Sequence, residues 1–305
     1  MHKIRASIWL DNQAEAAADF YAATFPGARI TATIRYPEAG REIHGGEPGS
    51  VLTVDLDIAG FCMTLLNGGP HFRPNPSISF FYHCETDAEV DRIWSAMVPG
   101  GTTHMELGSY PWSPRYGWLS DRYGVSWQII VDPDASERIV PSLLFVGDRC
   151  GQAEDAMRHY TEVFRDAAIG EIYRYESGQD PEREGTVMHG QFRLEGQPFV
   201  AADSAADHDF AFSEGVSLVV DALTQEEIDY YWQSLSAVVD SEQCGWLKDH
   251  YGVSWQIYPV TEMNEFLSLP DRNVVNRVMD AMLAMKKIDL AVLRSAAGAA
   301  PHQRG

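Results

Sequence analysis

The chain has 305 residues, of which 45% are hydrophobic and 22% are charged; this balance is typical of globular proteins and the length suits about two domains. Its formal net charge is −21, so its surface repels nucleic-acid phosphates and anionic lipids, and we expect neither nucleic acid nor membrane as a partner. No apolar run approaches the roughly 18 residues that a membrane span needs, and no secretory signal is recognisable.

The first half of the chain predicts alternating strands and helices. Asn12 with Glu15, and Thr86 with Glu89, have the spacing of a capping box and mark two helix starts. In chain order, the predicted elements are a strand at 6–10, a helix at 13–24, a strand at 28–36, a hairpin of 50–58 with 61–66, a strand at 77–83, a helix from Thr86, and closing strands at 117–121 and 125–131.

The second half repeats this order. Residues 117–129 and 245–257 are identical at eleven of thirteen positions, which chance does not explain. The repeated elements are a strand at 140–146, a helix at 152–163, a strand at 168–176, a hairpin of 186–194 with 197–202, a strand at 216–221, a helix from Thr224, and closing strands at 244–248 and 253–259. We therefore interpret the chain as a tandem duplication with domains at 1–135 and 138–260.

Residues 261–305 form a different segment. Apolar side chains between positions 274 and 285 follow helical spacing and predict two or three amphipathic helices. We expect these helices to pack on the second domain or on a partner. A methionine-rich stripe of this kind is more often core filling than a binding site.

Strand alternation separates an apolar face from a polar one. In the strand at 50–58, Thr53 and Asp55 lie on the face opposite to Leu52 and Val54. In the closing strands, Gln128 and Gln256 lie on the polar face. A curved sheet with helices outside and a polar concave side predicts a small-molecule site, and the alternative is that this face is merely solvated.

The cysteines and the absent motifs narrow the chemistry. Cys62, Cys84, Cys150 and Cys244 form no C-x-x-C pair and are too sparse for a disulfide scaffold, so we expect a reducing, cytoplasmic setting. The sequence contains no nucleophile elbow, phosphate-binding loop or zinc-protease helix.

The order of elements and the twice-seen D-x-Y-G-V-S-W-Q-I strand resemble the PhnB-like family. That family belongs to the vicinal oxygen chelate superfamily, with glyoxalases, bleomycin-resistance proteins and extradiol dioxygenases. The nearest resemblance is to the branch named after 3-demethylubiquinone 3-methyltransferase, and residues 66–72, 110–113, 244–249 and 277–289 carry it.

This resemblance implies an α+β fold of two tandem vicinal-oxygen-chelate domains, each of paired βαβββ modules forming a curved sheet, followed by C-terminal helices. Each repeat would be one complete domain of two modules. Such domains often dimerise, so the protein is expected either as a monomer whose two repeats imitate a dimer or as a homodimer. Methyl transfer is not favoured, because Gly45-Gly46 and Gly68-Gly69 do not precede a helix, as a methyl-donor loop would.

Metal-using relatives place a His on the first strand of a module and a Glu on the last. Here the His position falls at Ala6 or Ser7, and near Pro141 or Ser142 in the second copy. The Glu position falls at Gln128 and Gln256. Because an amide is a weak ligand for a divalent cation and alanine is none, we predict no metal and no other cofactor.

Three functions remain open. The first is a metal-independent protein that binds a small hydrophobic or aromatic molecule in a concave groove. The second is an enzyme acting on a small oxygenated or quinone-like substrate, with His189 or Asp203 as the acid–base group. The third is a structural partner that uses its helical tail. The predicted ligand-binding residues, four for stacking and three for orientation, are Trp9, Trp112, Trp118, Trp246, Asn67, Gln128 and Gln256.

Overall fold

The computed structural model describes residues 2–298. The elements of the first repeat are β1 (Ile4–Leu10), α1 (Ala14–Thr24), β2 (Arg29–Arg35), α2 (Arg41–His44), β3 (Val51–Ile58), β4 (Phe61–Asn67), β5 (Ile78–Cys84), α3 (Asp87–Met97), β6 (Thr102–Tyr110), β7 (Ser113–Ser120) and β8 (Ser126–Val131). The elements of the second repeat are β9 (Ile139–Val146), α4 (Ala153–Val163), β10 (Ala168–Arg174), β11 (Val187–Leu194), β12 (Gln197–Ser204), β13 (Val216–Asp221), α5 (Gln225–Leu235), β14 (Trp246–Lys248) and β15 (Ser254–Tyr258). The chain continues with α6 (Val260–Leu267), α7 (Arg272–Leu283) and α8 (Leu290–Ala296).

Most predicted elements are confirmed within a few residues of their ends. The Thr86 side chain accepts a hydrogen bond from the Glu89 backbone N–H, and Thr224 does the same from Glu227, so both capping boxes form. The predicted cap at Asn12 is wrong. Asn12 has a φ of 57°, and the orphan N–H of Ala14 is satisfied instead by the Asn67 side chain at 2.9 Å. The start of α1 is therefore capped by a residue distant in sequence and not by the preceding Asn12.

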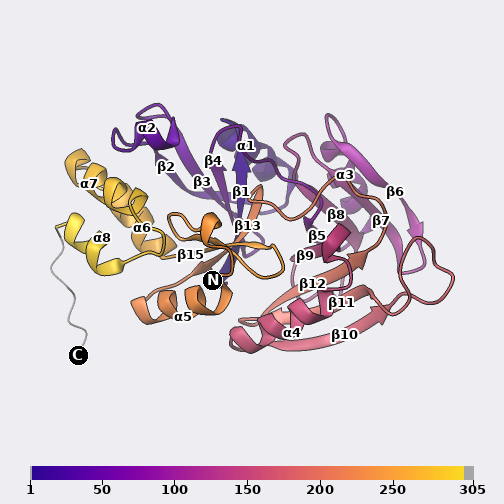
Figure 1. The fold of residues 1–305 in the computed structure, drawn as a ribbon. Helices are drawn as coiled ribbons and strands as arrows, with labels where there is room; N and C mark the ends of the chain where they lie inside the picture. The colour runs from indigo at the N-terminus through magenta and orange to yellow at the C-terminus, as the bar shows by residue number, and fades with distance from the viewer. Residues whose placement is uncertain (1, 299–305) are drawn as a thin grey trace.

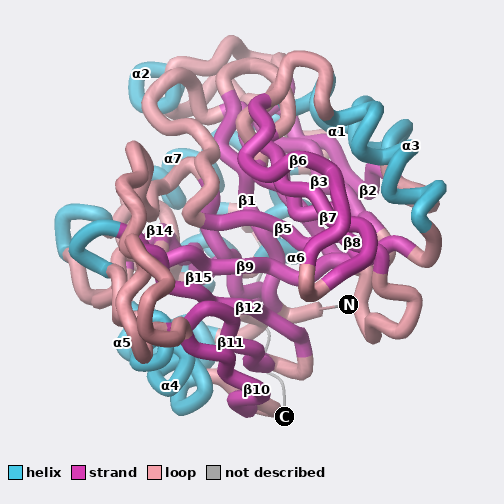
Figure 2. Tube along the Cα trace, turned by 90° about the vertical axis from the view of Figure 1, so that its right-hand side faces the viewer, coloured by secondary structure: helices cyan, strands magenta, loops and turns pink. Residues whose placement is uncertain are grey.

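The predicted α+β class is confirmed, with eight helices and two curved sheets among the described residues. Sheet A has the order β14-β15-β13-β1-β4-β3-β2, and sheet B has the order β10-β11-β12-β9-β5-β8-β7-β6. Figure 1 shows the two sheets side by side, and Figure 2 shows α1, α3, α4 and α5 outside the strands.

The pairing of modules differs from the expectation that each repeat makes its own sheet. Sheet A joins the first module of the first repeat to the last module of the second, through an antiparallel β1–β13 pair with Ser7 opposite Ser217. Sheet B joins the two middle modules through β5 and β9, with Ser79 opposite Ser142. Because each sheet takes one module from each repeat, neither repeat completes a sheet alone. The limits at 135 and 260 stay a prediction.

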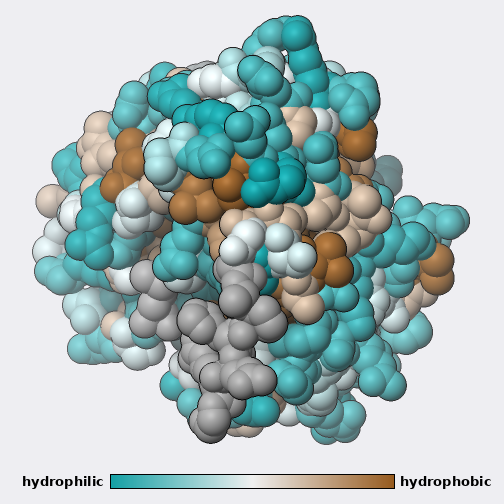
Figure 3. All heavy atoms as spheres, turned by 90° about the vertical axis from the view of Figure 1, so that its left-hand side faces the viewer, coloured by the Kyte–Doolittle hydropathy of each residue, from teal (hydrophilic) through white to brown (hydrophobic). Residues whose placement is uncertain are grey.

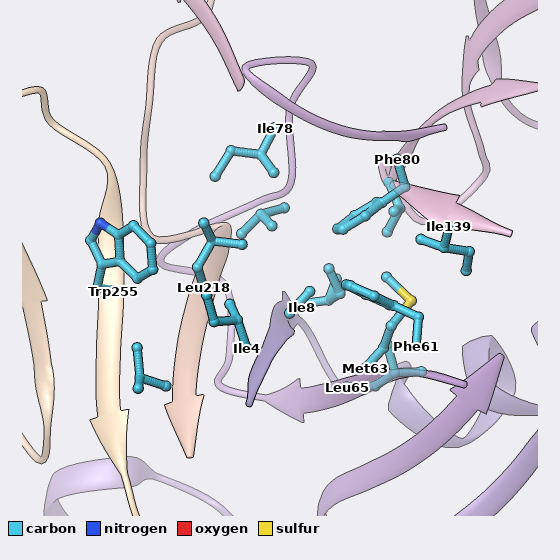
Figure 4. Packing of buried hydrophobic residues seen from close by; sticks show 14 of the residues in the cluster. Ile4, Ile8, Phe61, Met63, Leu65, Ile78, Phe80, Ile139, Leu218 and Trp255 are labelled. Carbon is cyan, nitrogen blue, oxygen red and sulfur yellow. The ribbon is translucent and has the colours of Figure 1, made fainter. Parts of the chain in front are cut away.

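The two sheets share one apolar core. Figure 4 shows Phe61 and Met63 of sheet A facing Phe80 and Ile139 of sheet B. The rings of Phe61 and Phe80 lie 6.0 Å apart. The buried Gln197 side chain of β12 also exchanges two hydrogen bonds with the backbone of Ile4, at 2.9 and 2.8 Å. The halves are therefore joined by apolar packing and by satisfied polar contacts.

The repeated motif builds one buried network in each repeat. In the first, the Asp121 carboxylate accepts hydrogen bonds from the Tyr21 hydroxyl at 2.7 Å and the Trp127 indole at 3.1 Å, and from two backbone N–H groups of its own turn. In the second, Asp249 accepts the same four bonds, with the Tyr160 hydroxyl at 2.6 Å and the Trp255 indole at 2.8 Å. The network ties the closing strand of one module to the helix of another.

The C-terminal helices cover the concave face of sheet A. Asn264 of α6 donates to the Asp55 carboxylate of β3 at 2.9 Å, and Asn276 of α7 accepts from the backbone N–H of Glu38 at 3.1 Å. These helices therefore contact the first repeat as well as the second, on which they were expected. Figure 3 shows that their outer side is largely hydrophilic, with hydrophobic residues near the middle. No helix in the described part of the chain is long and apolar enough to cross a membrane.

Replacing either motif aspartate should destabilise the fold by a similar amount. Asp121→Ala and Asp249→Ala each leave a buried tyrosine hydroxyl and a tryptophan N–H without a hydrogen-bond acceptor. We therefore expect each variant to lose about 3 kcal/mol of unfolding free energy. Urea unfolding followed by circular dichroism measures this loss. Asp240→Ala, at an exposed position, is the control and should change stability by less than about 0.5 kcal/mol. A loss below about 1 kcal/mol in the two motif variants would contradict the role of the network.

Candidate functional site

A chamber of about 280 Å³ lies between the concave face of sheet A and helices α6 and α7. Its volume is at the small end of the range for small-molecule sites. The floor is formed by strands from both repeats, and the roof by the C-terminal segment. The main lining residues are Ser7, Trp9, Thr53, Asp55, Thr64, Leu66, Trp246, Gln256, Tyr258, Asn264, Met279 and Met282.

Two of the predicted tryptophans meet in this chamber. The rings of Trp9 and Trp246 lie 6.3 Å apart at an interplanar angle of 62°. The Trp9 indole donates to the Gly69 carbonyl at 2.8 Å, and the Trp246 indole donates to the Ser217 hydroxyl at 3.2 Å. Because both N–H groups are engaged with the protein, the rings offer apolar faces to a ligand.

Gln256 is the only predicted orienting amide that lines the chamber. Its residue is 7% exposed, and no described residue makes a hydrogen bond to its side chain, whose polar atoms stay accessible from the chamber. The matching Gln128 of sheet B accepts from the Tyr116 hydroxyl at 2.6 Å and donates to the Ser79 hydroxyl at 2.9 Å. The two glutamines are therefore equivalent in sequence and different in environment.

A buried charged cluster lies at one end of the chamber. The guanidinium of Arg5 lies 3.6 Å from the Asp55 carboxylate and 3.9 Å from Asp221. Asp55 also accepts from the Thr64 hydroxyl at 2.7 Å and from Asn264. Burial raises the pKa of Asp221 above its usual value, against the opposing effect of Arg5. The Arg5 charge is thus balanced by protein carboxylates.

The chamber wall near α2 is aromatic and uncharged. The His44 ring stacks on Tyr36 with centroids 4.5 Å apart. The Nδ1 atom of His44 accepts from the Gly46 backbone N–H at 3.0 Å, and its Nε2 atom lies 3.0 Å from the Ala39 carbonyl oxygen. This arrangement selects the neutral tautomer that carries its proton on Nε2. Ile43, which also lines the chamber, is 63% exposed and lies at its mouth.

The structure separates the other predicted binding residues from this chamber. Trp118 pairs with Gln128 across β7 and β8 in sheet B, and its indole donates to Ser126 at 2.8 Å. Trp112 is 59% exposed at the β6–β7 turn and stacks on Tyr110. His189 packs edge-on against Phe81 at 6.3 Å, and burial lowers the pKa of its imidazole. These residues lie on sheet B or at its β6–β7 turn, and the described helices of the C-terminal segment line the chamber of sheet A instead.

Asn67 and Asp203 hold matching places at the ends of β4 and β12, where both cap a helix. Asn67 accepts from the Ala14 backbone N–H and donates to the Val51 carbonyl. The Asp203 carboxylate accepts from Gly151 at 2.7 Å, from Ala153 at 3.2 Å and from Val187 at 2.9 Å. Burial raises the pKa of Asp203 while these backbone donors lower it. Two of these backbone bonds tie the carboxylate to the start of α4 and the third ties it to β11, and neither side chain lines the chamber.

The positions that hold a metal in relatives do not fit one here. Ser7 and Gln256 lie at these positions in sheet A, and Ser142 and Gln128 in sheet B. Within residues 2–298, no group of three His, Cys, Asp or Glu side chains is placed to hold a cation. Hydroxyl and amide oxygens form a weak donor set for zinc, nickel or iron, and the Asp55 carboxylate of the chamber is engaged by Thr64 and Asn264. The described cysteines are all free thiols.

The family profile of 3-demethylubiquinone-9 3-methyltransferase matches residues 2–130 and again residues 137–258. The chain belongs to this family. A PhnB protein from Bacillus cereus, described as a putative 3-demethylubiquinone-9 3-methyltransferase, is 32% identical; the match covers 43% of this chain and 99% of that one, with a TM-score of 0.39. No curated protein matches the chain.

Maize glyoxalase I shares the fold over both repeats. The structure of this enzyme is 11% identical, with a TM-score of 0.51, and covers 88% of this chain and 96% of its own. A V278E mutant of the same enzyme gives 12% identity and a TM-score of 0.54, with 87% and 95% covered. The predicted relation to the PhnB-like proteins and the vicinal oxygen chelate superfamily is confirmed. At this identity the likeness to glyoxalase establishes the fold alone.

Sequence reasoning missed several chamber residues. The sequence indicates Ser7 only as the position of a missing metal ligand, and Asp55 only as part of a polar strand face. It indicates Met279 and Met282 of α7 as core residues, and in the structure they also form part of the chamber roof. The signal for Asp55 was its alternation with apolar neighbours in β3. No local pattern indicated that α7 would lie over that face.

The two glutamines should respond differently to the same change. Gln128→Met removes the partner of two buried hydroxyls, those of Tyr116 and Ser79, and should cost about 1–3 kcal/mol of unfolding free energy. Gln256→Met removes an amide that no described residue satisfies, and should cost less than about 1 kcal/mol. Thermal unfolding of the two variants beside the natural protein measures this contrast. Equal losses would contradict the difference in environment.

Proposed function

We propose that the protein binds a small, hydrophobic or aromatic molecule in the sheet A chamber without a metal. The observation that carries this proposal is a mostly apolar, tryptophan-lined chamber in which the Gln256 amide makes no hydrogen bond to a described residue and stays accessible to a ligand. The fold is that of the glyoxalase and bleomycin-resistance superfamily. A pocket that is mostly apolar with few polar groups suits ligand binding.

The chamber of sheet A is favoured over the face of sheet B for two physical reasons. First, residues of α6 and α7 line it opposite the strands, so a ligand would be partly removed from water. Second, the amide of sheet B is engaged by Tyr116 and Ser79, whereas that of sheet A is available. His189 and Asp203 remain proposals as acid–base groups for an enzyme, and they lie outside this chamber.

Binding of 2-naphthol, a neutral two-ring aromatic, should depend on the chamber tryptophan. Trp246→Leu should weaken binding about tenfold, because it removes a stacking surface worth about 1.4 kcal/mol. The matched control is Trp118→Leu, at the same position of the first repeat, which should leave the affinity within about twofold. Isothermal titration calorimetry measures all three affinities. The proposal fails if the two variants weaken binding equally.

The protein should also bind no stoichiometric metal. We expect elemental analysis of protein purified without chelator to find only traces of zinc, nickel, manganese and iron, because Ser7 and Gln256 replace stronger ligands. Treatment with EDTA should leave 2-naphthol binding unchanged. One equivalent of any of these metals would refute metal independence.

We further propose that the protein acts in the cytoplasm as a monomer in which the two repeats imitate a dimer. The support is that each sheet takes its modules from both repeats, so one chain already contains two complete sheets. Light scattering after size-exclusion chromatography should give the mass of one chain across a range of concentrations. A mass of two chains at every concentration would favour the homodimer instead.

A further inference from the structure

The Gln256 side chain is the feature of the chamber that the fold itself does not explain. It lies on β15 with its residue only 7% exposed. The amide offers one acceptor oxygen and two N–H donors, and because its polar atoms are accessible from the chamber they can bond to a ligand there. Among residues 2–298, the groups that would satisfy it are absent or engaged elsewhere. At the matching position of the first repeat, the Gln128 amide is hydrogen-bonded to Tyr116 and Ser79.

Two differences between the repeats leave the Gln256 amide without the hydrogen bonds that Gln128 makes. The position of Tyr116, whose hydroxyl donates to Gln128, is occupied by Cys244 in the second repeat. The position of Ser79 is occupied by Ser217, whose hydroxyl accepts the Trp246 indole instead. Cys244 also lines the chamber and is 4% exposed. Replacing the tyrosine by the smaller cysteine therefore frees space and a hydrogen-bonding group at the same place.

The charges around the chamber disfavour an ionised ligand. Arg5 is balanced by Asp55 and Asp221, and both ring nitrogens of His44 are engaged by backbone groups. Apart from the exposed His71, no side chain among the described lining residues is left to offer a positive charge to a carboxylate or phosphate, and the net charge of −21 repels anions at a distance. The Asp55 carboxylate already accepts hydrogen bonds from the Thr64 hydroxyl and the Asn264 amide. The recognition groups that remain are the Gln256 amide and the Ser7 and Thr53 hydroxyls, which are neutral and can both donate and accept.

The neighbours of Gln256 set the shape of the ligand beside it. Trp246 lies directly opposite Gln256 in the β14–β15 pair, and Val219 lies opposite on the other side. A planar ring beside the Trp246 face can thus place its edge against the amide. An amide edge matches best a group with an N–H and a C=O side by side, as in a cyclic amide, because two parallel hydrogen bonds then form.

We propose that Gln256 recognises a neutral aromatic lactam, or another planar ring with a donor next to an acceptor, through a paired hydrogen bond. This inference rests on the proposed function, since it names the ligand class of the same chamber. The ring stacks against Trp246, and its amide edge faces Gln256. The sheet B face has no corresponding specificity, because Tyr116 and Ser79 engage Gln128.

The experiment uses the full chain and three related probes in isothermal titration calorimetry. The probes are quinolin-2(1H)-one, its N-methyl derivative, which lacks the donor, and quinoline-2-carboxylate, which is anionic. We expect the lactam to bind about tenfold more tightly than the N-methyl derivative, and the carboxylate to bind weakest. In Gln256→Met, the lactam should lose about tenfold and the gap between the lactam and the N-methyl derivative should close to less than about twofold.

Gln128→Met is the matched control and should preserve the full gap between the two neutral probes. Circular dichroism of each variant checks that the chain is folded, and Gln256→Asn offers a second variant that keeps the amide but shortens its reach. If the lactam and the N-methyl derivative bind equally well to the natural protein, or if Gln256→Met leaves their gap unchanged, the lactam assignment is overturned while ligand binding in the chamber stands. If none of the probes and not even 2-naphthol binds, both proposals fail.

Discussion

The buried carboxylate of each D-x-Y-G-V-S-W-Q-I motif holds the architecture together. Asp121 and Asp249 each receive two side-chain and two backbone hydrogen bonds in a region closed to water. Burial raises the pKa of both carboxyls, and the donors oppose this rise. The tyrosine comes from a helix at the start of the repeat and the aspartate from the turn before its last strand. The network therefore links elements about a hundred residues apart, which local structure cannot do.

This link explains how one repeat can contribute to two sheets. Tyr21 lies on α1 over sheet A, whereas Asp121 lies beside sheet B, so their contact bridges the two. In the second repeat, Tyr160 lies on α4 over sheet B and Asp249 lies beside sheet A, so their contact also bridges the two sheets. The interleaved sheets follow, with a core that runs continuously from one to the other. A single chain thus contains the arrangement that two separate copies of one repeat could make by exchanging modules.

The two sheets then diverged through what lies on their concave sides. Sheet A has a cover from α6 and α7, a charged cluster around Arg5, and a glutamine without a tyrosine partner. Sheet B has the tyrosine–glutamine–serine bonds and the additional strand β6 at its edge. The same residue type at the same strand position is structural in one sheet and available for recognition in the other. Duplication allows this, because one copy preserves the fold while the other changes.

The sequence alone determined the duplication, the order of strands and helices, both threonine caps and the family, because these depend on local patterns and on direct comparison of the two halves. It also placed Gln256 on a polar strand face and gave Trp9 and Trp246 as candidates for stacking on a ligand. Only the tertiary structure decided which modules share a sheet, since the apolar pattern of a strand is the same whichever neighbour it pairs with. It alone showed that Asn67 and Asp203 cap helices and that α7 roofs one sheet and not the other. Those facts depend on contacts between residues far apart in the chain, and no local pattern encodes them.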